Sequence, residues 1–238
     1  MFTIKQPSEI IFGKNSAKEF HFPERPLVIS SKGCKSRNWL EYLELSDPIL
    51  FDNVEPNPSM ETVNSIISKF DESEFDYIIG LGGGSSLDVA KFVGFKTLKK
   101  KIMIPTTFGS GSEVTRISVL KINGKKTSFH DDGIIPDIAI VDSNFLNNTP
   151  IEIIKNSAID ACAQCTEGYD SKNGNIYTKF LCYEAFKILE DAILTENYEK
   201  LALGSLIDGL GFGNCSTTLG HALSYVFSNE GYNHGHAL

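Results

Sequence analysis

Short apolar runs alternate with longer segments of helical periodicity in the first half of the chain. Met60–Phe70 predicts an amphipathic helix with Ser59 as its N-cap, and Leu87–Phe95 predicts a second helix. Strands that alternate with helices in this way predict a parallel sheet with helices on both faces. The apolar runs that predict the strands are Leu27–Ser30, Tyr77–Leu81, Ile102–Pro105 and Ile138–Val141.

Helical patterns dominate the second half, from about Ile151 onward. Ile153–Tyr169 and Tyr177–Leu194 predict two helices, and the glycine-rich stretch Leu201–Leu223 suits close helix packing. Pro150 marks the boundary, because proline is favoured where a helix starts. We therefore expect an α/β domain over residues 1–149 and a helical domain over residues 150–238.

Composition narrows the class of protein. The chain has 238 residues, a formal net charge of -8 and 41% hydrophobic residues, which is ordinary for a globular protein. An acidic balance argues against nucleic acid and anionic membranes as partners. No apolar run approaches the roughly 20 residues that span a bilayer, and the N-terminus lacks the apolar core of a signal peptide. We expect a cytoplasmic protein.

The five cysteines are scattered and odd in number, so they are a poor disulfide framework. Cys162 and Cys165 form a C-x-x-C pair, which raises a redox or zinc interpretation. We favour a structural role, because the pair lies within a helical pattern and no second C-x-x-C exists to complete a zinc site.

A glycine-rich turn follows the predicted strand Tyr77–Leu81 and opens the next helix. It comprises Gly82, Gly83, Gly84 and Ser85. Glycines let the backbone approach a phosphate closely, and a helix N-terminus offers free N–H groups to an anion. The alternative is a tight structural turn. The spacing differs from G-x-G-x-x-G, and no Gly-Lys-Ser/Thr of a P-loop follows.

Two further features lie near this turn. Asp88 and Lys91 share one face of the following helix, either as a surface pair or to order a cofactor. A second loop, Pro105–Thr115, follows another strand and is rich in hydroxyls, which suits a nucleotide at the strand ends. Its alternative is a polar surface loop. The hydroxyl residues that we assign to cofactor binding are Thr106, Thr107, Ser110 and Ser112.

Candidate metal ligands occur in the second half. Three of the five histidines, His221, His234 and His236, fall in the last 18 residues. Asp160 and Gln164 lie four apart, on one helix face. Asp160, Gln164, His221 and His234 together suit a divalent metal such as Zn²⁺ or Fe²⁺. Structural histidines and a surface aspartate are the alternative.

These motifs resemble the iron-containing alcohol dehydrogenase family. Gly82–Lys91 resembles its GGGS-x-x-D-x-AK signature, and Pro105–Thr115 resembles its PTT-x-GTGSEVT segment. Ile159–Ala161, His221–Leu223 and His234–Gly235 match its metal-binding motifs. Pro7–Gly13, Pro56–Pro58 and Pro136–Asp142 match further landmarks in the same order.

The resemblance implies a Rossmann-like parallel-sheet domain followed by an all-helical metal-binding domain, with Fe²⁺ or Zn²⁺ in the cleft between them. It also implies hydride transfer between NAD or NADP and a small aldehyde or alcohol, and a homodimer. Lys126 and Leu146 are further cofactor contacts on this basis. The metal would act as a Lewis acid.

Three departures from the family pattern shape our expectations. Gln164 stands where the family usually has histidine, so we expect weaker binding of soft metals and a specialised, anionic substrate such as a phosphonate or sugar-acid aldehyde. Tyr225 replaces a common histidine, and its phenol either relays a proton or lines the pocket. His236 is a second candidate for proton transfer, with a structural role as its alternative. Family members continue beyond the position of Leu238, so the chain is a natural short form or a fragment with a shortened helical domain.

Ser31 and Lys32 follow the first predicted strand, where NAD-preferring members tend to place an acid. Because these side chains would accept a 2′-phosphate, we expect NADP(H) to be used. Two alternatives to a dehydrogenase are a dehydroquinate-synthase-like lyase, which lacks this combination of motifs, and a truncated nucleotide-binding module without catalysis.

Overall fold

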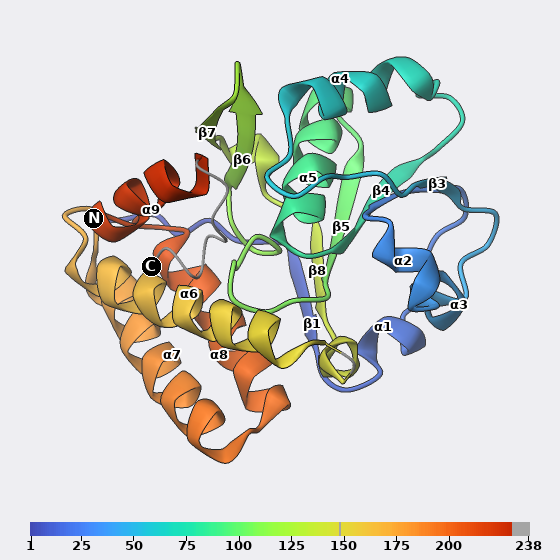
Figure 1. The fold of residues 1–238 in the computed structure, drawn as a ribbon. Helices are drawn as coiled ribbons and strands as arrows, with labels where there is room; N and C mark the ends of the chain where they lie inside the picture. Colours follow the sequence, from blue (N-terminus) through green and yellow to red (C-terminus); the bar gives the residue numbers. More distant parts are fainter. Residues whose placement is uncertain (148, 230–238) are drawn as a thin grey trace.

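A parallel sheet organises the computed structural model, which describes residues 1–147 and 149–229 (Figure 1). Six strands lie in the order β1-β8-β5-β4-β2-β3, and every neighbouring pair is parallel. The strands are β1 (Glu9–Phe12), β2 (Pro26–Ser30), β3 (Ile49–Phe51), β4 (Tyr77–Gly82), β5 (Lys100–Pro105) and β8 (Ile138–Val141). The central strands are uninterrupted apolar runs because both faces of the sheet are covered.

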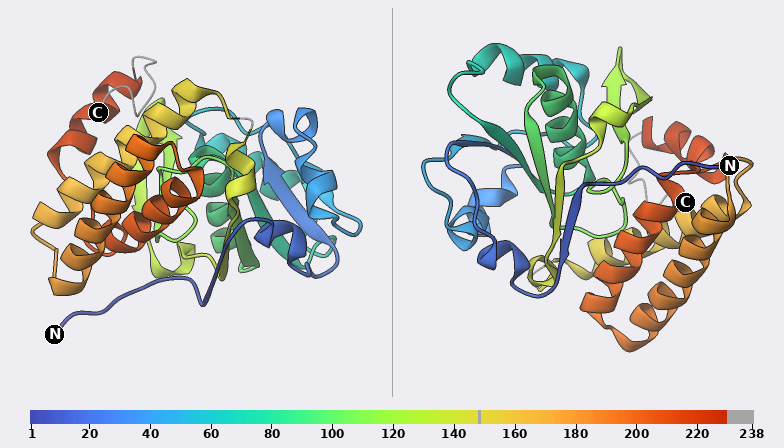
Figure 2. Two further views of the ribbon diagram at one scale, coloured as in Figure 1. Left: turned by 90° about the horizontal axis from the view of Figure 1, so that it is seen from below. Right: turned by 180° about the vertical axis from the view of Figure 1, so that it is seen from behind.

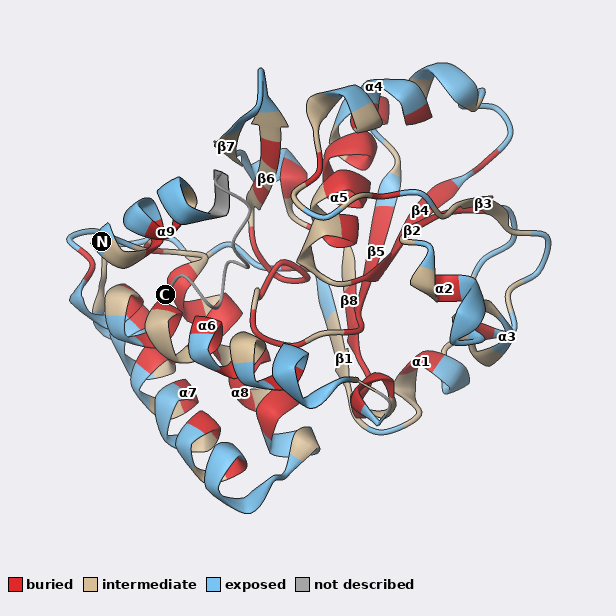
Figure 3. Cartoon of the chain, viewed as in Figure 1, coloured by how far each residue is buried: buried red, intermediate tan, exposed pale blue. Residues whose placement is uncertain are grey.

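Side chains of β2 show how the two faces are filled. Leu27 and Ile29 pack toward the core beneath the helices α4 and α5, whereas Val28 packs toward α1 to α3 on the other face. Figure 3 colours the central strands β2 and β4 and much of α5 as buried, whereas the edge strands β1 and β3 are largely intermediate. The helices on these faces are α1 (Ser16–Glu19), α2 (Gly33–Ser36), α3 (Trp39–Leu43), α4 (Met60–Lys69) and α5 (Gly84–Thr97).

The second half of the chain is helical, as the sequence predicts. Its helices are α6 (Ile151–Asp170), α7 (Ile176–Thr195), α8 (Tyr198–Phe212) and α9 (Leu219–Asn229). The glycine-rich stretch Leu201–Leu223 comprises most of α8 and the start of α9, with a break between them. The break follows from residues 213–216, which begin with glycine and asparagine, poor helix formers, and end with Ser216 in the left-handed region at φ 70°. The predicted fold class, a parallel-sheet domain followed by helices, is confirmed.

One hydrophobic core joins the sheet to the helices. Ala139 and Val141 of β8 cluster with Ala158 and Ala161 of α6 and with side chains from α7 and α8. The helices lie beside the edge of the sheet that carries β1 and β8 (Figure 2). The boundary expected near residue 150 falls between a short 3-10 helix, η2 (Ser143–Leu146), and α6.

A β-hairpin, made of β6 (Ile117–Ile122) and β7 (Lys125–His130), was not predicted from the sequence. Its turn is Asn123-Gly124, and both residues have positive φ, 51° and 78°. This conformation matches the twist of two antiparallel strands, and Asn-Gly is its preferred sequence. The hairpin is followed by the 3-10 helix η1 (Asp132–Ile134) and lies between α5 and α9 (Figure 1).

In the part of the chain that the structure describes, no helix combines the length and apolar character needed to cross a membrane.

Candidate active site

The glycine-rich turn joins β4 to α5. Gly82 ends the strand with φ 153°, Gly83 is the N-cap, and Gly84 is the first helical residue. A Cβ atom at Gly82 would lie 2.7 Å from Ser86 Oγ, so only glycine fits without a shift. The first N–H groups of α5, including that of Ser85, have no carbonyl one turn earlier to bond, which makes them available to an anion.

The hydroxyl-rich loop lies directly against this turn. A Cβ atom at Gly83 would lie 2.9 Å from Thr107 Oγ1, and one at Gly84 would lie 3.0 Å from Ser110 Oγ. Thr106 is buried, and its N–H donates to the Gly82 carbonyl at 2.9 Å. Two motifs 20 or more residues apart therefore converge at the N-terminus of α5.

Asp88 is occupied by contacts within the protein. Its Oδ1 accepts a hydrogen bond from Ser112 Oγ at 2.6 Å and lies 3.3 Å from Lys91 Nζ, and its Oδ2 accepts from Val119 N at 3.0 Å. The surface-pair interpretation is wrong, because Lys91 is fully buried. Asp88 and Ser112 thus fix the hydroxyl-rich loop and the hairpin to α5; a direct contact of either with a cofactor stays a prediction.

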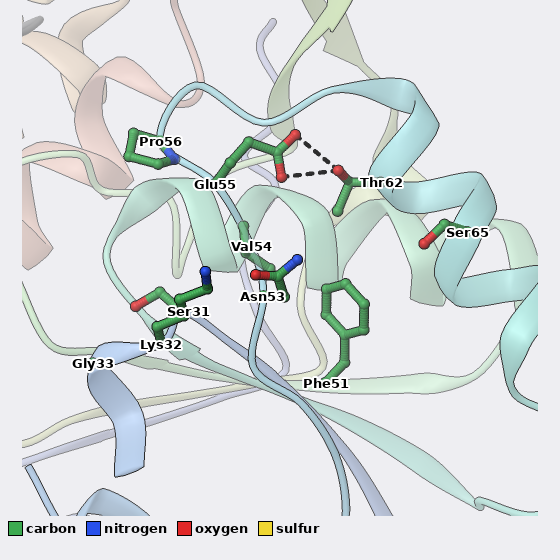
Figure 4. A pocket seen from close by; sticks show the side chains of 10 residues that line it. All are labelled: Ser31, Lys32, Gly33, Phe51, Asn53, Val54, Glu55, Pro56, Thr62 and Ser65. Atoms are coloured by element: carbon green, nitrogen blue, oxygen red, sulfur yellow. Dashed lines mark hydrogen bonds between the residues drawn. The ribbon is translucent and has the colours of Figure 1, made fainter. Parts of the chain in front are cut away.

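A pocket of about 590 Å³ lies beyond the end of β2 (Figure 4). Ser31 and Lys32 line it, together with Asn53, Glu55 and Thr62. Sequence reasoning missed Glu55, because the β3–α4 connection brings it to the pocket from a distant part of the chain.

The Glu55 carboxylate is engaged by its neighbours. It accepts hydrogen bonds from Ser59 Oγ at 2.9 Å and from Thr62 Oγ1 at 2.8 Å. Burial raises the pKa of Glu55, but hydrogen bonds from its own backbone, Thr62 and Ser59 outweigh burial, so the net pKa is lowered. The pocket therefore holds a negative charge whose oxygens are partly screened by hydroxyls.

Three predicted metal ligands come together where α6 faces α9. Asp160 Oδ1 lies 3.3 Å from His221 Nε2 and accepts a hydrogen bond from Gln164 Nε2 at 3.0 Å. All three residues are buried, with at most 9% of each residue exposed, so Asp160 is not a surface charge. The hydroxyl-rich loop reaches α6 one turn earlier, where a Cβ at Gly109 would lie 2.2 Å from the Ser157 carbonyl oxygen.

Glu167 orients His221 and was missed from the sequence. The Oε2 atom of Glu167 lies 3.3 Å from His221 Nδ1, and its Oε1 accepts a hydrogen bond from the backbone N–H of His221 at 3.1 Å. A seven-residue spacing from Asp160 places Glu167 on the same face of α6, which is the signal that could have found it. Burial lowers the pKa of His221, but the carboxylates of Asp160 and Glu167 raise it more strongly, so the net pKa is raised.

Asp160, Gln164 and His221 suit a divalent metal only if the side-chain amide of Gln164 is counted as a ligand. Within residues 1–147 and 149–229, no group of three His, Cys, Asp or Glu side chains is placed to hold a metal. Gln164 Oε1 is buried and has no hydrogen-bond partner in this part of the chain. A buried carbonyl oxygen without a partner, next to a carboxylate and an imidazole, fits a cation. The predicted fourth ligand, His234, and the predicted proton donor His236 lie outside the described residues.

The remaining predicted residues lie in two different environments. Tyr225 is on α9, with Lys126 Nζ of the hairpin 5.4 Å from the centre of its ring. Burial raises the pKa of Tyr225 to about 12, and Asp88 and Asp160 add to the rise, so the phenol stays protonated at neutral pH. Leu146 is buried in the core that joins sheet and helices, with its carbonyl bonded to Thr149 N at 3.0 Å.

Two fully buried carboxylates near the site also escaped sequence reasoning. They are Glu113 of the hydroxyl-rich loop and Asp208 of α8. Burial raises the pKa of Glu113 to about 7, and it raises that of Asp208 well above its ordinary range. A hydrogen bond with Cys165 lowers the pKa of Asp208, whereas the charges of Asp160, Cys215 and Glu113 raise it. Cys162 and Cys165 lie within α6 with free thiols, as the structural interpretation predicts.

Comparison with known proteins gives a consistent result. The family model for iron-containing alcohol dehydrogenase matches residues 7–143. Long-chain-alcohol dehydrogenase 1 of Geobacillus thermodenitrificans is 32% identical over 210 residues, which cover 76% of this chain and 53% of the relative. The 4-hydroxybutyrate dehydrogenase of Clostridium kluyveri is 31% identical over 209 residues, 76% of this chain and 56% of the relative. The chain thus spans about half the length of these curated relatives.

A solved structure extends the likeness to the whole fold. Sulfoacetaldehyde reductase from Bifidobacterium kashiwanohense, in complex with NAD⁺, superposes with a TM-score of 0.89 at 27% identity. The match covers 100% of this chain and 74% of that one. The arrangement of sheet, hairpin and helices is therefore shared with a nucleotide-bound reductase.

Proposed function

Because the chain belongs to the iron-containing alcohol dehydrogenase family, we propose that it transfers hydride between a nicotinamide cofactor and a small aldehyde or alcohol. The observation that carries the proposal is one convergence. The loop that meets the N-terminus of α5 also packs on α6, one turn before the Asp160–Gln164–His221 set. A nucleotide bound at the N-terminus of α5 would therefore present its reactive end to the Asp160–Gln164–His221 set.

The cofactor would lie along the ends of the parallel strands. Gly82, Gly83 and Gly84 allow a close backbone approach, and the α5 N-terminus attracts the phosphates. Thr107 and Ser110 add hydroxyls beside them. The nicotinamide supplies the hydride, so the task of these residues is to orient it.

Asp160, Gln164 and His221 would hold a divalent metal, Fe²⁺ or Zn²⁺, with His234 as a further ligand. Such a metal supplies a Lewis acid for the substrate oxygen. Glu167 contacts Nδ1 of the His221 ring, and this contact orients the other ring nitrogen, Nε2, toward Asp160. Gln164 offers a neutral amide oxygen, so the set is harder than one with another imidazole.

Carbonyl reduction also needs a proton, which we assign to Tyr225 or to His236. A Tyr225 phenol with its pKa near 12 keeps its proton at neutral pH, so it can donate but is a poor base. We therefore expect aldehyde reduction to be favoured over alcohol oxidation if Tyr225 fills this role.

We propose that NADP(H) is accepted at the pocket that Ser31 and Lys32 line. Lys32 offers a positive charge to a 2′-phosphate, whereas the ionised Glu55 carboxylate in the same pocket opposes one, although its oxygens accept hydrogen bonds from Ser59 and Thr62. Comparison of the KM values for NADH and NADPH tests this choice. At least tenfold better use of NADH would refute it.

The central test combines metal analysis with turnover. We expect the purified chain to bind Zn²⁺ or Fe²⁺ and to oxidise NADPH or NADH with small aldehydes, and His221→Ala to lose metal and turnover together. His21→Ala, on an exposed loop, is the matched control. Full activity in His221→Ala would refute the site. A metal-free chain with no turnover would instead favour a nucleotide-binding module.

A further inference from the structure

Three cysteine thiols gather where α6, α7 and α8 pack together (Figure 1). Cys165 of α6, Cys182 of α7 and Cys215, in the segment between α8 and α9, are each at most 2% exposed. All three are free thiols. The Cys182 and Cys215 thiols share a hydrogen bond, although they are distant in sequence. Two thiols in contact can close into a disulfide bond with only a small movement of the backbone.

Two glycines bring these two thiols together. A Cβ atom at Gly168 of α6 would lie 2.8 Å from Cys182 Sγ, and one at Gly211 of α8 would also lie 2.8 Å from it. Cys215 Sγ donates to the carbonyl oxygens of the same two glycines, at 3.3 Å to Gly168 and 3.5 Å to Gly211. Both sulfur atoms therefore pack against one pair of glycines, and a larger side chain at either glycine would displace Cys182.

The two thiols differ in how readily they ionise. The hydrogen bond with Cys182 lowers the pKa of the Cys215 thiol, burial opposes this decrease, and a hydrogen bond with Thr178 adds to it. The same thiol–thiol hydrogen bond raises the pKa of Cys182, and burial raises it further. Because the thiolate is the form of cysteine that reacts with oxidants, Cys215 is the reactive member of the pair.

The backbone around Cys215 gives an oxidant a route to the pair. Cys215 lies between the end of α8 and the start of α9, and the next residue, Ser216, has a left-handed conformation at φ 70°. A residue other than glycine is strained in this conformation. A strained connection between helices opens at a lower free-energy cost than the middle of a helix, where Cys182 lies. A small oxidant therefore reaches Cys215 first.

The same connection leads into the metal-binding half of the candidate site. Ser171 Oγ donates to the Cys215 carbonyl at 2.6 Å, which fixes the connection to the end of α6. Further along, the backbone N–H of His221 donates to Glu167 at 3.1 Å. Glu167 immediately precedes Gly168, whose carbonyl accepts from Cys215 Sγ. A displacement of Cys215 therefore acts on both partners of the contact between Glu167 and His221.

We propose that Cys182 and Cys215 form a reversible disulfide bond that weakens metal binding at the proposed site of His221. A disulfide bond is only about 2.05 Å long, so the Cys215 segment must move toward α7 when the bond forms. Cys215 also loses its S–H as a hydrogen-bond donor to α6. The start of α9, which carries His221, would follow this movement. The inference rests on the proposed function, because it concerns the regulation of that metal site.

With hydrogen peroxide as the oxidant, the reaction proceeds in two balanced steps. The Cys215 thiolate attacks one peroxide oxygen, the O–O bond breaks, and protonation of the leaving hydroxide gives water and a Cys215 sulfenic acid. The Cys182 thiol then attacks the sulfenic sulfur, the S–O bond breaks, and the thiol proton leaves with the hydroxide as a second water. Two thiols thus lose two electrons to one peroxide, and a dithiol reductant reverses the change by thiol–disulfide exchange.

Peptide mapping tests the thiol pair without metal or turnover. The full chain is oxidised with hydrogen peroxide, its remaining thiols are alkylated, and it is digested with trypsin. We expect a disulfide-linked pair of peptides, 180–187 with Cys182 and 201–238 with Cys215, which dithiothreitol separates. The other cysteines fall in different tryptic peptides, so any other pairing gives a different product. An oxidised chain in which these two peptides stay unlinked overturns the inference.

A chelator competition tests the consequence for the metal. The oxidised chain should bind Zn²⁺ about tenfold more weakly than the reduced chain, because groups that orient metal ligands change affinity by this order. Treatment with dithiothreitol, removed before the measurement, should restore the affinity. Cys215→Ser and Cys182→Ser should each abolish the response to peroxide. Cys34→Ser is the matched control and should keep the response, since Cys34 lies in the core of the α/β half.

The outcomes separate this inference from the proposed function. Equal Zn²⁺ affinity of the reduced and oxidised chains overturns the regulatory role. A loss of affinity that persists in Cys215→Ser also overturns it, because oxidation elsewhere then causes the loss. A reduced chain that binds no Zn²⁺ refutes the proposed metal site and the regulatory role together, and peptide mapping still decides whether the thiols pair. If the thiols pair and Zn²⁺ affinity falls but no aldehyde is reduced, only the dehydrogenase is refuted.

Discussion

Replacement of Glu113 by glutamine should change how stability depends on pH. Glu113 is 1% exposed, and its Oε1 has no hydrogen-bond partner among the described residues. Burial raises its pKa to about 7 from an ordinary value of 4.5, although a backbone hydrogen bond and Lys91 oppose the rise. Since one pKa unit is worth about 1.4 kcal/mol, the ionised side chain costs about 3 kcal/mol of stability.

The direction in which stability changes with pH follows from the number of protons that the folded and unfolded chains bind. Between pH 4.5 and about 7 the folded chain holds a proton on Glu113 that the unfolded chain has lost. Glu113 therefore does not destabilise the folded chain below pH 4.5. Stability declines as pH rises from 4.5, and the full loss is reached above about pH 7. Glutamine does not titrate, so the Glu113→Gln variant lacks this decline.

Urea unfolding followed by the fluorescence of Trp39, the single tryptophan, would measure the effect at pH 5, 6, 7 and 8. The stability of Glu113→Gln relative to the unsubstituted chain should rise by about 2.5 kcal/mol across this range. Only the change with pH is diagnostic, because the new amide adds a constant offset of its own. Glu24→Gln, at an exposed position, is the control. A difference that stays flat from pH 5 to pH 8 would refute the reasoning.

Two further substitutions test the contact between the loop and α6 and the metal donor set. Gly109→Ala should destabilise the chain by about 3 kcal/mol in urea unfolding, because its Cβ would lie 2.2 Å from the Ser157 carbonyl oxygen and φ is 150°. Gly13→Ala, with φ 146° and open space, should cost clearly less, and equal losses would contradict a steric cause. Gln164→His should strengthen Zn²⁺ binding about tenfold in a chelator competition, because imidazole is the softer ligand. Unchanged affinity would show that residue 164 is not a ligand.

Local patterns in the sequence determined the sheet, the main helices and the glycine-rich turn. Ile138–Val141 is apolar throughout because both faces of β8 are covered, so this short run of residues is enough to predict a strand. The turn at Gly82 could be recognised because a strand precedes it and a helix follows. Asn123-Gly124 carried a local hairpin signal that our sequence analysis did not use. β3, with three half-buried residues at the sheet edge, is too short for periodicity to find.

Only the tertiary structure decided which polar residues meet and what they do. Asp88, which the sequence predicts as a cofactor residue, also fixes the hairpin to α5, and Glu167 contacts His221 only because α9 packs on α6. Burial of Glu113 likewise depends on elements distant in sequence. Secondary structure follows from periodicity within a segment, whereas pKa values, metal geometry and substrate charge follow from contacts between segments. The family was readable from the chain, but the contacts of its buried polar residues became visible only after folding.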